Sequence, residues 1–115
     1  LTIADPIEIL ATIKAASRVP TAQQIAPYRE AITFIVYDVE RVLSGIYTDG
    51  EILIAHWGMR DAKHTAAAGW KPGLQQRLRV DAFDSHPPLA EITMAADADD
   101  GLLTPYWALE PPRKP

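Results

Sequence analysis

Apolar and polar residues alternate along much of this chain with the two-residue period of β-strands. The longest such stretch is residues 32–45, which is crowded with β-branched and aromatic residues. Its apolar side chains keep one phase through Ile35, Tyr37 and Val39. The phase changes near Glu40-Arg41, and a phase change of this kind predicts a β-bulge that bends the strand. A long, bent strand is typical of a small closed barrel.

Three further segments show patterns that predict strands. They are residues 7–13, 51–57 and 74–82. Residues 8–16 are also compatible with a helix, although their β-branched content favours a strand. Asp49-Gly50 supplies a turn, so residues 32–57 are predicted to form an antiparallel hairpin. The last of the three strands has an inward set and an outward set: Leu74, Leu78, Val80 and Ala82 face one side, and Gln75, Arg77, Arg79 and Asp81 the other.

The remaining segments have weaker patterns. Residues 20–27 are bounded by prolines and predict a loop or one helical turn. The connector 58–73 is compatible with a short helix and equally with a loop that covers one end of the barrel. Residues 89–94 allow one more strand, and residues 105–109 are expected to dock back onto the barrel.

Composition supports one globular, β-rich domain. The chain has 115 residues, of which 48% are hydrophobic and 23% charged, and ten prolines oppose long helices. We expect a single β-barrel domain over residues 1–110 and a disordered, proline-rich tail over residues 111–115. The predicted fold class is all-β, or β-rich with one short helix, with five or six antiparallel strands.

Charge and cysteine content narrow the range of partners. The formal net charge is −4 with no basic block, so we expect no nucleic-acid partner. No apolar run approaches the roughly 20 residues of a membrane-spanning helix, so no transmembrane segment is expected. The chain has no cysteine, which excludes disulfide bonds and thiol chemistry.

The order of the predicted strands resembles that of bacterial modules of the netrin-like or oligonucleotide/oligosaccharide-binding (OB) type. The resemblance covers residues 7–83 and rests on the strand ending Val42-Leu43-Ser44-Gly45 and on the later strand that begins at Gly73. Leu74 replaces the usual glutamine after that glycine, and Arg77 stands where an aromatic residue is common. The resemblance implies an OB-like barrel. The absence of the disulfides of animal netrin-like domains argues against an inherited inhibitor function.

Two shorter phrases point to the compartment. Ala55-His56-Trp57-Gly58 and residues 83–87 look like bacterial extracytoplasmic segments found beside enzymes that modify surface polysaccharides. This resemblance implies an exported accessory domain, so a periplasmic or secreted location is the expectation.

The candidate ligand-binding residues are aromatic and basic. Trp57 and Trp70 flank the connector and offer flat faces for a sugar ring, with His56 beside them. Arg77 and Arg79 lie on the outward face of their strand, where they suit an acidic saccharide or the carboxylate of a partner. We therefore predict a non-catalytic module that contacts carbohydrate or a partner protein.

Two alternatives remain open. One is a small metal-dependent enzyme that uses His56, His64 and Asp61, although their spacing matches no recognised metal motif, so we predict no metal and no cofactor. The phrase Asp84-Ser85-His86 has the residue types of a hydrolytic triad, but three consecutive residues cannot face one another. The other alternative is a purely structural domain that docks onto a larger protein.

Overall fold

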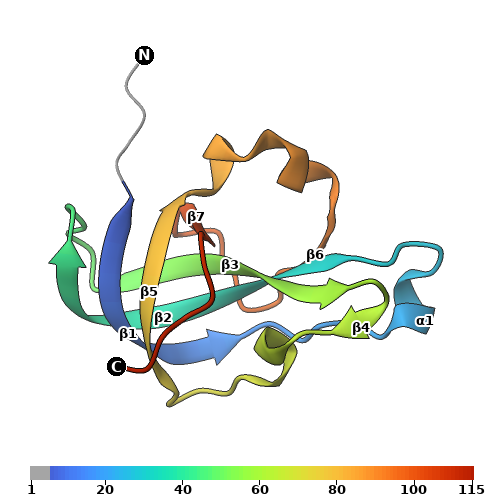
Figure 1. Ribbon diagram of the computed structural model, residues 1–115, viewed down its shortest axis with the longest axis horizontal. Helices are drawn as coiled ribbons and strands as arrows, with labels where there is room; N and C mark the ends of the chain where they lie inside the picture. The colour runs from blue at the N-terminus through green and yellow to red at the C-terminus, as the bar shows by residue number, and fades with distance from the viewer. Residues whose placement is uncertain (1–5) are drawn as a thin grey trace.

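A computed structural model describes residues 6–115 and shows a strand-rich molecule (Figure 1). The strands are β1 (Ile7–Ala16), β2 (Ala31–Ser44), β3 (Glu51–Arg60), β4 (Lys63–His64), β5 (Gln75–Ala82), β6 (Thr93–Ala95) and β7 (Pro105–Ala108). The helical elements are α1 (Ala22–Ile25) and the 3₁₀ turns η1 (Ala66–Gly69), η2 (Phe83–Ser85) and η3 (Pro87–Glu91). The first five residues of the predicted domain lie outside the described residues.

Five strands close into a barrel. Their order around the ring is β1-β2-β3-β7-β5, with β5 pairing back to β1, while β4 and β6 attach to β3 and β2 on the outside. The predicted small, all-β, OB-like barrel is therefore confirmed. The expectation of purely antiparallel pairing is wrong for β3–β7 and β2–β6, which are parallel. A closed ring with an odd number of strands cannot alternate in direction throughout, so one pair in the barrel must be parallel.

The predicted bend in β2 is present at the predicted place. Leu10 and Ala11 of β1 pair with Arg41 and Val39, so Glu40 is an extra residue without an opposite partner. A bulge of this kind sharpens the local bend and twist of a strand. As a result β2 pairs with β3 near its start and with β1 toward its end.

Apolar side chains form two main clusters on opposite sides of the barrel wall. The interior cluster contains Ile9, Ile13, Ile35, Tyr37, Ile52, Ile54, Leu78 and Val80, among others. The outer cluster contains Ile32, Phe34, Val36, Leu53, Ala55, Phe83 and Trp107, and Leu89, Ile92 and Leu103 pack against it. The segment that follows β5 thus covers the outside of β2 and β3, which explains why both faces of these strands are buried.

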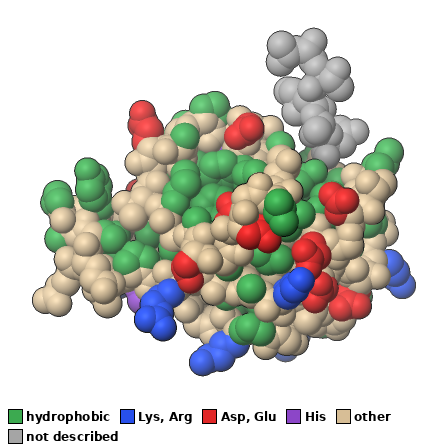
Figure 2. Space-filling model, turned by 180° about the vertical axis from the view of Figure 1, so that it is seen from behind, with side chains coloured by type: hydrophobic (Ala, Val, Ile, Leu, Met, Phe, Trp, Pro, Cys, Tyr) green, Lys and Arg blue, Asp and Glu red, His purple; other side chains and the backbone are tan. Residues whose placement is uncertain are grey.

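Figure 2 shows the molecule from behind. Hydrophobic side chains gather in the middle of this face with acidic side chains around them, and the basic side chains are dispersed. Within residues 6–115, no helix has the length and apolar character that crossing a membrane requires.

The connector 58–73 contains a short helix, η1, as one of the two expectations had it, but its first part is strand. β3 runs on to Arg60 and turns back into β4 through Asp61 and Ala62, which have φ angles of 51° and 60°. Only then does η1 follow. Residues 20–27 contain the single helical turn α1, which is capped because Thr21 and Gln24 bond reciprocally to each other's backbone N–H.

In β5 the inward phase is the expected one, but its members differ in part from the expected set. Gln76 points inward and is 6% exposed, whereas Leu74 precedes the strand and is 40% exposed. Within the segment predicted to be a disordered tail, Arg113 pairs with Arg77 of β5.

Candidate binding cleft

A cleft of about 340 Å³ opens beside β3 and collects most of the aromatic residues singled out above. Its walls are residues 56–57 of β3, residues 65–67 and Trp70 around η1, and residues 107–112 of β7 and the segment after it. We call this the aromatic cleft. Trp70 packs against the interior cluster, while Trp57 and Trp107 belong to the outer one. The cleft therefore lies where the two clusters meet.

The pairing of β3 with β7 places Trp107 in the cleft. Ala55 is the register partner of Trp107, so the indole of Trp57 reaches the same side of the sheet. The two rings meet edge to face with centroids 5.6 Å apart. The guanidinium carbon of Arg60 lies 4.0 Å from the centroid of the Trp57 ring, within the range of a cation–π interaction.

The segment around η1 forms the second wall and is tied to β3. The Thr65 hydroxyl donates to the carbonyl of Trp57, and the Thr65 N–H donates to the carbonyl of Gly58 over 3.0 Å. Trp70 follows η1 and meets the His56 ring edge to face with centroids 5.0 Å apart. This arrangement sets Trp70 over the imidazole.

His56 belongs to a hydrogen-bonded group inside the barrel. Its Nε2 lies 2.9 Å from the Tyr37 hydroxyl, which donates to Oε1 of Gln76 over 2.8 Å. His56 is 4% exposed, and burial lowers its pKa to about 3 because the charged imidazolium loses its hydration. Burial also raises the pKa of Tyr37 far above its ordinary value. Both groups are therefore neutral in the folded protein at neutral pH.

Sequence reasoning missed Tyr37 and Gln76 as partners of His56. A usable signal was present for Gln76, because position 76 has the same phase as Leu78 and Val80. A polar residue in an inward position needs a buried partner. The identity of that partner depends on register across the barrel, which periodicity does not supply.

Arg77 and Arg79 lie on the exposed side of β5 and are not among the residues that line the cleft. The Arg77 side chain pairs with Glu8. Their backbones hold the third wall, because Leu109 N–H donates to the Arg79 carbonyl over 3.0 Å and Arg77 and Arg113 exchange two bonds of 2.9 Å. The C-terminal segment consequently runs beside β5 (Figure 1).

The residues of the metal alternative are not brought together. Nε2 of His64 lies 2.7 Å from the Pro20 carbonyl, and Asp61 accepts from Arg29, while His56 is inside the barrel. Residues 6–115 contain no group of three or more histidine or carboxylate side chains that is suited to a metal ion. His86 of the triad-like phrase pairs with Asp81 rather than with Asp84.

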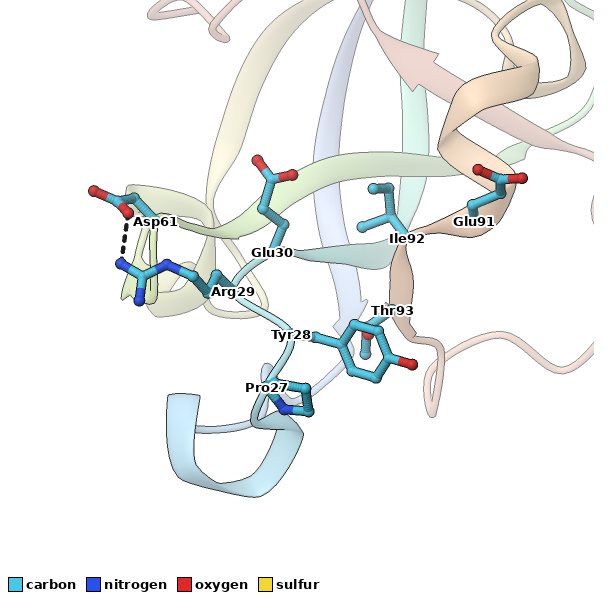
Figure 3. A pocket seen from close by; sticks show the side chains of 8 residues that line it. All are labelled: Pro27, Tyr28, Arg29, Glu30, Asp61, Glu91, Ile92 and Thr93. Carbon is cyan, nitrogen blue, oxygen red and sulfur yellow. Dashed lines mark hydrogen bonds and ion pairs between the residues drawn. The ribbon is translucent and has the colours of Figure 1, made fainter.

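A second hollow, of about 480 Å³, lies between the connection that precedes β2, the β3–β4 turn and the start of β6 (Figure 3). Tyr28 is 66% exposed at its edge. Arg29 and Asp61 point toward one another and form an ion pair, and Glu30 pairs with Arg60. Because these four charged side chains pair with one another, they are less available to bind a ligand in this hollow.

Comparison with family models, with curated proteins and with solved structures found no match to this chain. The resemblance to netrin-like and OB-type modules stays a prediction. What the aromatic cleft binds must therefore be argued from its own residues.

Proposed function

We propose that this protein is a non-catalytic binding module that holds a saccharide in the aromatic cleft. The observation that carries the proposal is the convergence of Trp57, Trp70 and Trp107, from three separate segments, on one largely apolar cleft. Small-ligand sites are typically concave and apolar with a few polar groups that fix orientation. The aromatic cleft has this composition.

A saccharide suits these walls better than an oligonucleotide. Both ligand classes bind OB-like barrels, and both present faces that stack on aromatic rings. An oligonucleotide also needs basic groups along its phosphates, and the chain has a net charge of −4. A neutral sugar ring needs only apolar faces and a few hydrogen-bonding groups.

The chemistry of His56 supports binding rather than catalysis. A general base works best when its pKa lies near the working pH. With a pKa of about 3, His56 is a weak base, and its Nε2 is engaged with Tyr37. It is better suited to positioning a ligand than to removing a proton from one.

We further propose that the protein is an exported accessory domain, and the support for this is the resemblance of residues 55–58 and 83–87 to bacterial extracytoplasmic segments. A purification of the full parent protein from periplasmic and secreted fractions would test it. A cytoplasmic location would contradict it.

Calorimetric titration tests the binding proposal. The probes are hexasaccharides of glucose, mannose and N-acetylglucosamine, each in its neutral form and with its C6 groups oxidised to carboxylates where that position is free. Trp57→Ala and Trp70→Ala should each weaken binding about tenfold, the loss expected for a stacking contact worth about 1 to 2 kcal/mol. Tyr28→Ala is the matched control, because Tyr28 lines the other hollow.

Circular dichroism spectra of each variant should match those of the parent protein. Loss of binding without loss of fold supports the aromatic cleft as the site. Binding to none of the saccharides, or equal binding by the tryptophan variants, would contradict the proposal.

A further inference from the structure

We propose that Nδ1 of His56 is a hydrogen-bond acceptor at the floor of the aromatic cleft, and that the cleft selects an uncharged saccharide whose hydroxyl group donates to it. This inference rests on the proposed function, since it names the ligand class of the same site. It is carried by the positions of hydrogens among Tyr37, His56 and Gln76.

The hydrogens can be assigned in sequence. Tyr37 has one hydroxyl hydrogen, which it donates to Oε1 of Gln76, an atom that only accepts. The hydroxyl oxygen must then accept from Nε2 of His56, which lies 2.9 Å away. A neutral imidazole carries one N–H, so that hydrogen is on Nε2 and Nδ1 has a free lone pair.

Nδ1 is open to the cleft. Among the described residues it makes no hydrogen bond, and no fully buried side-chain nitrogen or oxygen of those residues lacks a partner. Nδ1 therefore reaches the accessible surface, and the surface that His56 lines is the aromatic cleft. A residue that is 4% exposed thus offers one unpaired acceptor to a ligand.

The cleft presents further acceptors beside Nδ1 of His56, and the indole N–H groups of Trp57, Trp70 and Trp107 are donors in its walls. The hydroxyl hydrogen of Thr65 is already donated to the Trp57 carbonyl. Glu110 adds a carboxylate at the wall, partnered at 3.4 Å by Arg113. A ligand must therefore donate a hydrogen to Nδ1 and can accept hydrogens from the indoles. Sugar hydroxyls do both, whereas a carboxylate only accepts and cannot form a hydrogen bond with Nδ1.

An acidic saccharide has a competing place on the exposed side of β5. Arg79 is exposed there, and Arg77 is already paired with Glu8. Binding at that surface would depend on Arg79 and not on His56. The two arrangements are therefore separable by mutation and by the charge of the ligand.

The first experiment needs no ligand. ¹⁵N–¹H correlation spectra of the histidine side chains at neutral pH should show Nδ1 of His56 as an unprotonated nitrogen and Nε2 as a protonated one. The reverse assignment would overturn the inference directly.

The second experiment compares two substitutions in calorimetric titrations with the neutral hexasaccharides and their C6-oxidised forms. His56→Gln keeps a group that can bond to Tyr37 but has no atom at the Nδ1 position. His56→Asn keeps an oxygen there and loses the bond to Tyr37. We expect His56→Gln to weaken binding of the neutral saccharide about tenfold or more, and His56→Asn to retain it within about threefold.

The outcomes separate this inference from the proposed function. If Trp57→Ala abolishes binding and His56→Gln does not, the saccharide module stands and the inference fails. Tighter binding of the oxidised saccharides, lost in Arg79→Ala, also overturns the inference. If no saccharide binds, both proposals fail, because the ligand class is then wrong.

Discussion

Tyr37 and His56 face each other inside the barrel, with the tyrosine oxygen 2.9 Å from Nε2. They come from neighbouring strands β2 and β3, and Gln76 reaches the same oxygen from β5 on the other side of the interior. A barrel of this size is filled by side chains, and most of those here are aliphatic. The hydrogen-bonded group thus lies in an apolar interior, where the polar atoms of Tyr37 and His56 find their hydrogen-bond partners within the group.

Replacing Tyr37 with phenylalanine should destabilise the protein by about 1 to 3 kcal/mol. The change leaves the ring in place but removes the partner of both Nε2 of His56 and Oε1 of Gln76. Urea denaturation followed by tryptophan fluorescence measures the loss. Tyr28→Phe is the control, because Tyr28 is exposed and its hydroxyl makes no side-chain bond among the described residues. Equal stability of Tyr37→Phe and the parent would show that this group adds nothing.

Stability should fall as the pH is lowered from 6.5 toward 3. His56 has a pKa of about 3 when folded and about 6.5 when unfolded, so between these values the unfolded chain binds a proton that the folded protein does not. His56 therefore favours folding fully above pH 6.5, and this contribution declines below it, by about 1 kcal/mol per pH unit.

The pH effect is measured by urea denaturation between pH 7 and pH 5, above the range where most carboxylates titrate. His56→Gln should flatten the curve. A His56→Gln curve as steep as that of the parent would contradict the assignment.

Alanine should be poorly tolerated at Gly58. A Cβ atom there would lie 2.8 Å from Cγ2 of Val19 and 3.2 Å from Cβ of Thr33. We expect Gly58→Ala to cost about 1 to 3 kcal/mol in thermal or urea denaturation, as overpacking usually does. Gly69→Ala is the matched control, because its Cβ would meet nothing within 4 Å. It should change stability by less than about 0.5 kcal/mol.

The backbone pairing of Arg113 with Arg77 should hold the third wall of the aromatic cleft. Arg113→Pro removes the N–H that donates to the Arg77 carbonyl, while Arg113→Ala removes only the side chain. Hydrogen exchange of the Arg77 amide, which donates to the Arg113 carbonyl, should become faster in Arg113→Pro and stay near the parent rate in Arg113→Ala. Unchanged exchange in the proline variant would mean that the wall is held elsewhere.

Local pattern was enough to predict the barrel but not the hairpin after β3. The bulge at Glu40 was predictable because the alternation of apolar and polar residues changes phase there, and this change is visible in the sequence. The turn at Asp61 and Ala62 was missed because it lacks the glycine or asparagine that usually marks positive φ. Arg29 holds the turn from outside, through its carbonyl to the Ala62 N–H and its side chain to Asp61.

In the aromatic cleft, too, residues that are close in sequence were predicted, whereas contacts between distant segments were not. His56, Trp57 and Trp70 were predicted as candidate binding residues from one neighbourhood of the chain, and they do line one cleft. Trp107 joins them only through the parallel pairing of β3 with β7. Residues 105–109 were expected to dock back onto the barrel, but strand pairing across half the chain has no periodic signature, so the place of Trp107 in this cleft was not identifiable in advance.

The place of β7 in the ring governs when the molecule can fold. β7 is the last strand in the chain, yet it fills the gap between β3 and β5. During synthesis the facing edges of β3 and β5 therefore stay unpaired until residue 108 has left the ribosome. Closure of the barrel then requires contacts between segments that are distant in sequence. Ribosome-bound chains that stop before β7 should expose these edges to chaperones.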